Sequence, residues 1–258
     1  MSDHNYTIYQ VQVTTLSPLH IGTGRELLLD YDYALHSGQT WRLNEDKVLQ
    51  PHYSDDPAQI AKLSQTPPAK LLDASHFTLD SNFFRYVIKG QPRARTPGSI
   101  LREQIKTVND QPYLPGSSLK GALRTALAWH GWKAKNLRPE RQKIDERNAK
   151  FAGREYEAIL FGSDPKYDLL RALQVSDSDP IGKENLMLVN AKVLKAREEA
   201  APIEIETVAP EKKLHSQSKL THSCFRSGHA NARIFVWAVR KNGSTNWRRL
   251  RGRTQGSA

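Results

Sequence analysis

A glycine- and serine-rich turn that carries a lysine is the first segment whose residue types could do chemistry. Gly116-Ser-Ser-Leu-Lys-Gly121 has the glycine spacing of a phosphate-binding P-loop, but Ala122 and Leu123 follow where that motif requires Lys and then Ser or Thr. The missing lysine and magnesium-binding hydroxyl argue against nucleotide hydrolysis. Gly22-Thr-Gly24 also fails the dinucleotide pattern, because Leu27 stands in place of the third glycine. Neither segment predicts a nucleotide site.

The same turn precedes a predicted helix and therefore offers an anion site. A helix start presents free backbone N–H groups and the positive end of the dipole. Lys120 lies in the first turn, where a cation costs about 0.3–1 kcal/mol, and Arg124 follows four residues later on the same face. Two cations at this position are unfavourable unless a polyanion binds them. The alternative is that both are solvated surface charges.

Metal-ligand residue types gather near the end of the chain. The group comprises His215, His222, Cys224 and His229. These spacings match no zinc pattern, which needs a close second pair of ligands. We predict no metal site and no cofactor.

Asp177 and Asp179 flank Ser178 in a short acidic turn. Paired carboxylates could perform acid–base catalysis, but Asp and Ser are also the usual residues of turns and helix caps. We favour the structural role. No nucleophile and base are recognisable elsewhere, so the sequence predicts no catalytic residue.

The elements that must position these residues are strands and helices without regular alternation, which indicates an α+β fold. The clearest helix follows Pro115-Gly116. Ser117 or Ser118 would cap its start and Gly131 would end it. Its apolar stripe, at intervals of three and four, consists of Leu119, Ala122, Leu123, Ala126 and Leu127.

Period-two and apolar runs predict strands. They cover residues 6–15, a hairpin of 27–35 with 40–43 around Ser37-Gly38, and residues 83–88, 186–194, 203–208 and 232–239. Residues 56–63 predict a short helix. Residues 133–154 are rich in Lys and Arg and predict an exposed helix or a mobile insertion.

The net charge of +11 is concentrated near the C-terminus. No acidic residue follows Glu211, while residues 212–258 contain 11 Lys and Arg, which accounts for the whole excess. Such a segment attracts polyanions through long-range, salt-sensitive forces. A loosely ordered solubilising tail is an equally good interpretation.

Composition limits the class of protein. The 258 residues are enough for one large domain or two small ones, and 38% hydrophobic residues indicate a globular chain. No apolar stretch approaches the roughly 20 residues of a membrane span, and the first ten residues lack a signal-peptide pattern. Cys224 is the single cysteine and fits a reducing compartment. We predict a cytoplasmic protein.

Several segments together resemble the RAMP superfamily of type III CRISPR effector complexes. They are Ser17-Pro-Leu-His-Ile-Gly-Thr-Gly24, Tyr31-Asp-Tyr33 with Trp41-Arg-Leu-Asn-Glu-Asp-Lys-Val48, Tyr113-Leu-Pro-Gly-Ser-Ser-Leu-Lys-Gly-Ala-Leu-Arg-Thr-Ala126, Asp168-Leu-Leu-Arg-Ala-Leu-Gln-Val-Ser-Asp-Ser178 and Pro202-Ile-Glu-Ile-Glu206. Their order is closest to the subunits that cap the Csm (type III-A) complex near the 3′ end of the crRNA. The resemblance covers roughly residues 6–220.

The resemblance implies a ferredoxin-like (RRM-like) core with helical and loop insertions in region 1–211. It implies a non-catalytic subunit that contacts crRNA and neighbouring RAMP backbone subunits, supports crRNA maturation in antiviral defence and works with host nucleases. Segment 212–258 does not match the family's second half, and we expect that half to be shortened or divergent. By matching motif, the RNA-binding residues are His20, Gly22, Ser117, Ser118, Lys120 and Arg124.

Two other classes of protein, an RNA endonuclease and a structural adaptor, remain open. Some relatives are RNA endonucleases, and here Asp177 or His20 would be the catalytic candidates. A purely structural adaptor, held in a complex by protein contacts alone, would carry its basic charge incidentally.

Overall fold

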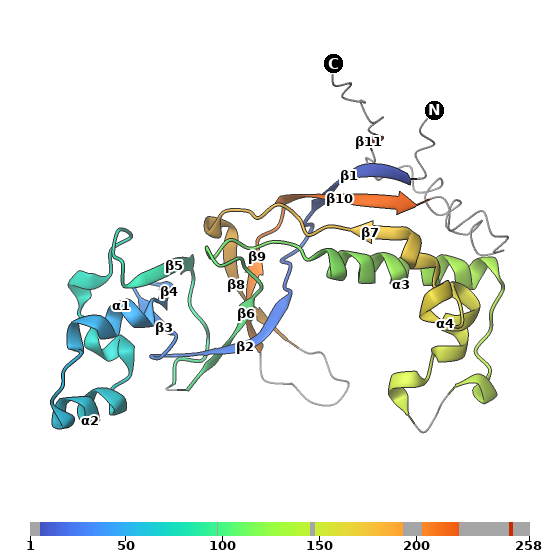
Figure 1. Cartoon of the computed structure of the whole chain (residues 1–258). Helices are drawn as coiled ribbons and strands as arrows, with labels where there is room; N and C mark the ends of the chain where they lie inside the picture. The colour runs from blue at the N-terminus through green and yellow to red at the C-terminus, as the bar shows by residue number, and fades with distance from the viewer. Residues whose placement is uncertain (1–5, 97, 145–147, 193–202, 222–247, 250–258) are drawn as a thin grey trace, which may run out of the picture. The chain divides into compact units, whose positions relative to one another are not determined.

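The chain folds into two compact units that are interleaved along the sequence (Figure 1). This computed structural model describes residues 6–96, 98–144, 148–192, 203–221 and 248–249. Unit 1 comprises Met1–Val13, Leu114–Asp179 and Leu214–Ala258, and unit 2 comprises Thr14–Tyr113 and Pro180–Lys213. Both contain strands and helices without regular alternation, so the predicted α+β class is confirmed.

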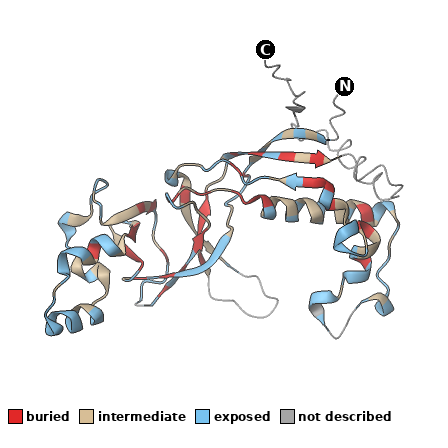
Figure 2. Ribbon diagram, viewed as in Figure 1, coloured by how far each residue is buried: buried red, intermediate tan, exposed pale blue. Residues whose placement is uncertain are grey.

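Unit 1 is built on a sheet with helices packed against it. The strand order is β11 (Arg248–Arg249), β1 (Tyr6–Thr14), β10 (Lys213–Thr221) and β7 (Leu173–Val175). The helices are α3 (Gly116–Ala134) and α4 (Arg154–Phe161). Its core joins Leu160 and Phe161 of α4 to Leu173 and Leu220 of the sheet, with α3 packed against them. In Figure 2 buried residues are red, and red segments lie on α4, β7 and β10.

Helix α3 forms where predicted, but its buried face is shifted from the predicted stripe. Leu123 and Leu127 pack against the core as expected, but Trp132 joins them, while Ala122 and Ala126 are exposed. Small side chains add little apolar area, so the larger Leu and Trp side chains decide which face is buried.

The prediction that Gly131 ends α3 is wrong. The helix continues because Trp132 packs against Tyr156, with ring centroids 4.7 Å apart. Asn136 ends it instead, with φ of 49°. The N–H of Leu137 donates to the carbonyl of Trp132, and that of Asn136 to the carbonyl of Lys133, which is a Schellman arrangement.

The start of α3 lies against the segment that follows β7. Leu114 N–H donates to Ser178 Oγ at 2.9 Å, and Ser178 N–H donates to the Leu114 carbonyl at 2.9 Å. A Cβ at Gly116 would lie 2.3 Å from the carbonyl oxygen of Val175. Only glycine therefore permits this approach, which sets the position of the PGSSLKG turn.

The described residues of unit 2 form two sheets and two short α-helices. One sheet has the order β2 (Gly22–Leu28), β6 (Ile100–Gln104), β9 (Ile203–Val208) and β8 (Leu186–Ala191), and the other has the order β3 (Tyr33–His36), β4 (Gln39–Leu43) and β5 (Phe84–Lys89). The helices are α1 (Glu45–Leu49) and α2 (Pro57–Gln65). Its buried clusters include Leu27 with Leu101, and Leu43 with Val48.

The predicted hairpin exists but is shorter than expected. Ser37 and Gly38 have φ of 48° and 76°, the left-handed pair of a two-residue hairpin turn. Residues 27–35 are not one strand, because Asp30 has φ of 71° and ends β2 there. Strand β2 pairs instead with β6, a strand that the sequence did not reveal.

The remaining predictions vary in outcome. The strands at 6–15, 83–88 and 203–208 and the helix at 56–63 are confirmed, the helix starting one residue later because Asp56 is its cap. Strand 186–194 is confirmed to Ala191, and strand 232–239 lies outside the described residues. Between α3 and α4 the described residues form only short 3₁₀ turns. Helices α1 and α4 and strands β6, β7, β10 and β11 were missed. No described helix is long and apolar enough to cross a membrane.

Gly116→Ala should destabilise unit 1, because the new methyl group would overlap backbone atoms that cannot move independently. We expect a loss of about 1–3 kcal/mol, measured by urea unfolding of the full chain. The control is Gly121→Ala on the same helix, whose Cβ would meet nothing within 4 Å. The Gly121→Ala substitution should raise the free energy of unfolding by about 0.5–1 kcal/mol. Equal effects of the two substitutions would contradict the close approach.

Candidate nucleic-acid interface

The predicted RNA-binding residues of unit 1 lie on the first half of α3. Ser117 is exposed, and Ser118, Lys120 and Arg124 are half-buried. Neither serine caps the helix, contrary to the prediction. Asp177 supplies the cap instead, its Oδ1 accepting the Gly116 N–H at 2.7 Å. The structural role favoured for this aspartate is therefore confirmed.

The cap changes the electrostatics of the helix start. A carboxylate beside the first N–H groups stabilises the positive end of the dipole. It also offsets the unfavourable position of Lys120 in the first turn. Asp177 occupies the Gly116 N–H, so a phosphate at this site would be held by Lys120, the serine hydroxyls and the following N–H groups of the first turn.

Arg124 is ion-paired within unit 1. Its guanidinium lies 2.8 Å from Asp168 and 3.2 Å from Glu157 of α4, and it stacks over the Phe161 ring at 4.1 Å. Burial lowers the pKa of Arg124, but the Asp168 and Glu157 carboxylates outweigh it and the pKa is raised. These carboxylates therefore neutralise Arg124 without a bound polyanion. Its contact with RNA stays a prediction.

A cleft of about 670 Å³ lies between α3 and α4. Basic side chains outnumber acidic ones on its walls. They are Lys120, Arg124, Lys150, Arg154 and Arg171, against Glu157, Asp164 and Asp168. Within the described part of the chain, no carboxylate lies within 4 Å of the Lys120 ammonium. Lys120 thus remains available to a ligand on the wall of the cleft.

The predicted residues of unit 2 lie where the chain enters β2. His20 Nδ1 donates to the carbonyl of Glu206 at 2.7 Å, and Ile21 N–H donates to Gln104 Oε1 at 2.8 Å. A Cβ at Gly22 would lie 3.0 Å from His20 Nε2. Backbone contacts therefore fix the conformation of this segment.

A buried ionic network supports that segment. Glu206, whose side chain is 1% exposed, accepts hydrogen bonds from Tyr86 Oη at 2.8 Å and Gln104 N–H at 3.1 Å, and from Lys106 Nζ at 2.5 Å. Lys106 also lies 3.6 Å from Glu103. Burial raises the pKa of Tyr86 well above its ordinary value, and Glu206 adds to the effect. Tyr86 therefore stays a neutral donor to this carboxylate.

The structure brings the predicted residues together as two groups, one in each unit. Sequence spacing did not reveal their supporting residues, which include Asp168, Glu157, Glu206 and Gln104. The sequence signal that could have revealed Glu206 is the run Ile203-Glu-Ile-Glu206, in which two acidic residues alternate with apolar ones in a predicted strand.

The catalytic candidates make structural contacts. Asp177 caps α3, and His20 bonds to a backbone carbonyl. In the described residues, neither has a hydrogen bond to a titratable side chain that could complete an acid–base pair. No group of three metal-ligating side chains occurs in the described ranges. His222, Cys224 and His229 lie outside them.

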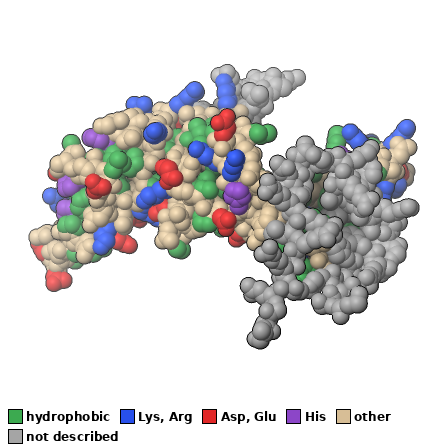
Figure 3. All heavy atoms as spheres, turned by 90° about the horizontal axis from the view of Figure 1, so that it is seen from above, with side chains coloured by type: hydrophobic (Ala, Val, Ile, Leu, Met, Phe, Trp, Pro, Cys, Tyr) green, Lys and Arg blue, Asp and Glu red, His purple; other side chains and the backbone are tan. Residues whose placement is uncertain are grey.

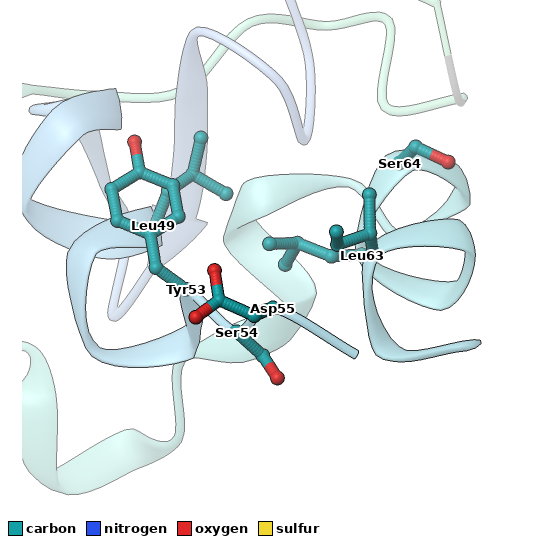
Figure 4. Close-up of a pocket in the computed structure, with 7 residues that line it drawn as sticks. Leu49, Tyr53, Ser54, Asp55, Leu63 and Ser64 are labelled. Atoms are coloured by element: carbon teal, nitrogen blue, oxygen red, sulfur yellow. The ribbon is translucent and has the colours of Figure 1, made fainter. Parts of the chain in front are cut away.

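A hollow of about 580 Å³ lies in unit 2, beside α1 and α2 (Figure 4). Its walls are formed by Leu49, Tyr53, Ile60 and Leu63, with the single carboxylate of Asp55. It has no cation and does not suit a phosphate.

The surface charge of the described residues is mixed on the face shown in Figure 3. Lys and Arg side chains lie among Asp and Glu side chains there, so they form no continuous basic strip along which RNA could bind.

A family comparison identifies the class of protein. The model of the RAMP superfamily matches residues 12–251. The chain belongs to this superfamily.

Curated relatives narrow the comparison within the superfamily. The chain is 28% identical over 251 residues to the CRISPR system Cms protein Csm5 of Streptococcus thermophilus, covering 84% of this chain and 65% of that protein. It is 29% identical over 182 residues to the Csm5 protein of Methanocaldococcus jannaschii, covering 66% of this chain and 42% of that one. The chain thus spans less than two thirds of the length of either relative.

Solved structures share the fold. The crystal structure of T. onnurineus Csm5 matches with a TM-score of 0.67 and 23% identity, over 89% of this chain and 73% of that one. A chain of a Csm–crRNA–target RNA ternary complex of a type III-A CRISPR-Cas system matches with a TM-score of 0.67 and 24% identity. That match covers 91% of this chain and 70% of that one.

Lys106→Met should destabilise unit 2, because it leaves Glu206 buried without its cation. Breaking a buried pair costs about 3–5 kcal/mol, which urea unfolding of the full chain would detect. In Lys106→Met/Glu206→Gln both charges are absent and an acceptor for Tyr86 remains, so most of the loss should be recovered. No recovery in the double variant would show that the two charges are not coupled.

Proposed function

We propose that the chain is a non-catalytic, crRNA-binding subunit of a type III-A (Csm) effector complex. It caps the protein backbone near the 3′ end of the crRNA and supports crRNA maturation. Membership of the RAMP superfamily and the similarity to proteins named Csm5 support this proposal. The crRNA and neighbouring RAMP subunits are then its partners, and the recruitment of host nucleases and a cytoplasmic location stay predictions.

The observation that carries RNA binding is the environment of Lys120. Its ammonium has no carboxylate partner in the described part of unit 1, and it lies on the wall of a cleft with an excess of basic side chains. The exposed Ser117 hydroxyl lies one turn away on the same helix. These groups suit a phosphate and read no base, as a protein that carries any guide sequence requires.

A ferredoxin-like core is part of the proposal. In chain order the strands of unit 1 are β1, β7, β10 and β11, and their order in the sheet is fourth, first, third, second. The β1–β11 and β7–β10 pairs are antiparallel. This order and the helix between the first two strands are those of the βαββαβ fold, which supports an RRM-like scaffold.

The contacts of Asp177 and His20 favour a binding subunit over an endonuclease. General acid–base catalysis requires a side chain within hydrogen-bond reach of a transferred proton. Asp177 is engaged by a helix start and His20 by a backbone carbonyl. Both are explained as supports of the RNA-contacting segments.

Lys120→Ala and Arg124→Ala should have different effects. Loss of Lys120 should weaken RNA binding and reduce the slope of log K against log[salt] by about 0.7, the value for one single-strand phosphate. Loss of Arg124 should destabilise the fold by about 1 kcal/mol, because it removes two ion pairs. Filter binding and thermal unfolding of the full chain measure the two effects.

Lys133→Ala is the matched control for Lys120→Ala. Lys133 is exposed in the last turn of α3 and lies outside the cleft. The Lys133→Ala variant should leave the slope of log K against log[salt] unchanged. An unchanged slope for Lys120→Ala as well would remove this lysine from the proposed interface.

Ultraviolet crosslinking of the co-expressed complex tests the function directly. Mass spectrometry should find RNA attached to peptides from residues 17–25 and 113–126. If the chain co-purifies with other subunits but crosslinks nowhere, it is an adaptor held by protein contacts, and the RNA-binding proposal fails.

A further inference from the structure

A basic loop joins β5 and β6 in unit 2. Residues 81–102 contain five Lys and Arg and no acidic residue. Residues 90–96, Gly-Gln-Pro-Arg-Ala-Arg-Thr, form the part that we name the arginine loop. None of the interface residues described above belongs to it.

A buried carboxylate fixes the middle of the arginine loop. Glu204 Oε1 accepts the N–H of Arg93 at 2.6 Å and that of Ala94 at 2.9 Å. Glu204 is 6% exposed, and its Oε2 is buried with no hydrogen-bond partner in the described residues. A buried carboxylate is costly unless hydrogen-bonded, so these two bonds hold the loop backbone in place.

Both ends of the loop are also held. Thr40 Oγ1 of β4 donates to the Gly90 carbonyl at 2.9 Å. Beyond the other end, Ser99 N–H donates to the Thr96 carbonyl at 2.9 Å, and Leu29 N–H donates to the Ser99 carbonyl at 3.0 Å. A loop fixed at its middle and both ends loses little conformational entropy when a ligand binds.

The two arginines of this loop differ from the others in the unit. Each described arginine of unit 2 outside the loop lies within 4 Å of a carboxylate, namely Arg25, Arg42, Arg85 and Arg102. Arg93 and Arg95 are exposed, and no carboxylate in the described ranges pairs with either. The backbone of Arg93 is thus anchored while its charge is unneutralised.

We propose that the arginine loop is a second RNA-binding site, in which Arg93 and Arg95 bind phosphates of a single-stranded RNA backbone. Guanidinium groups match phosphate in a bidentate geometry. A protein partner fits less well, because Pro92 is buried and the exposed side chains of the arginine loop include no aromatic or large apolar anchor. The choice of RNA as ligand rests on the proposed function.

The test compares variants of the full chain in binding to a labelled single-stranded RNA across a salt series. Arg93→Ala/Arg95→Ala should lower the slope of log K against log[salt] by about 1.4, because two phosphate contacts are lost at about 0.7 each. Arg93→Lys/Arg95→Lys should keep most of the slope, because the charges remain. The substitutions leave the backbone donors to Glu204 intact, so thermal unfolding should not change.

Lys47→Ala/Lys62→Ala is the matched control. It removes the same charge from exposed positions of unit 2, on α1 and α2, and should leave the slope unchanged. If the wild-type chain binds RNA and Arg93→Ala/Arg95→Ala keeps the wild-type slope, the second site is refuted while the proposed function stands. If the wild-type chain shows no salt-dependent RNA binding, the proposed function fails as well. If the variant keeps its slope but loses co-purification with neighbouring subunits, the loop binds protein and the RNA site is refuted.

Discussion

Strand β9 carries two buried carboxylates on one face, and the polar surface segments of unit 2 depend on them. Glu204 and Glu206 are two residues apart, so both side chains leave the strand on the same side. Buried carboxylates must be hydrogen-bonded to be tolerated. Tyr86, Gln104 and Lys106 donate hydrogen bonds to Glu206, and the backbone of the arginine loop donates two hydrogen bonds to Oε1 of Glu204. One strand thereby fixes both the loop and the support of His20.

Unit 1 uses the same principle at a helix start. Asp177 caps α3 and Ser178 bonds to Leu114, so the turn after β7 determines where α3 begins. Arg124 then ties α3 to Glu157 of α4 and to Asp168. Anionic side chains hold the backbone and neutralise some cations, while Lys120 remains unpaired in the described part of this unit. The division between paired and unpaired cations separates structural charges from those available to a ligand.

This division suits a protein that must hold RNA of any sequence. Phosphate contacts position a nucleic acid without reading it, and they need cations on a backbone that does not move when the ligand arrives. The proposed contacts have this character in each unit. Lys120 lies on a capped helix, and Arg93 lies on a loop whose backbone is hydrogen-bonded to a buried carboxylate. Neither arrangement requires a metal or a positioned acid–base pair.

Local sequence determined the elements whose signals are short-range. The period of α3, the Ser37-Gly38 turn and the alternation of β9 each depend on neighbouring residues, and all were predictable. The five ordered motifs also indicated the superfamily, because each is a run of adjacent residues that can be recognised without knowing its partners. The strands that were missed lack a clear apolar period: β6 and β7 are short, and β10 buries Ser216 and Ser218 between Leu214 and Leu220. Pairing with distant strands defines them.

Tertiary structure alone decided which charged groups are structural and which are available. Asp177 caps a residue 61 positions away, Arg124 pairs with an acid 44 positions away, and Glu204 holds a backbone 111 positions away. Sequence spacing cannot encode such partners, because the chain brings them together only when it folds. The sequence therefore determined which residues could bind a polyanion. Folding decided that carboxylates neutralise Arg124, while no carboxylate of the described residues pairs with Lys120, Arg93 or Arg95. The reason is that a carboxylate pairs with whichever donors the fold places beside it.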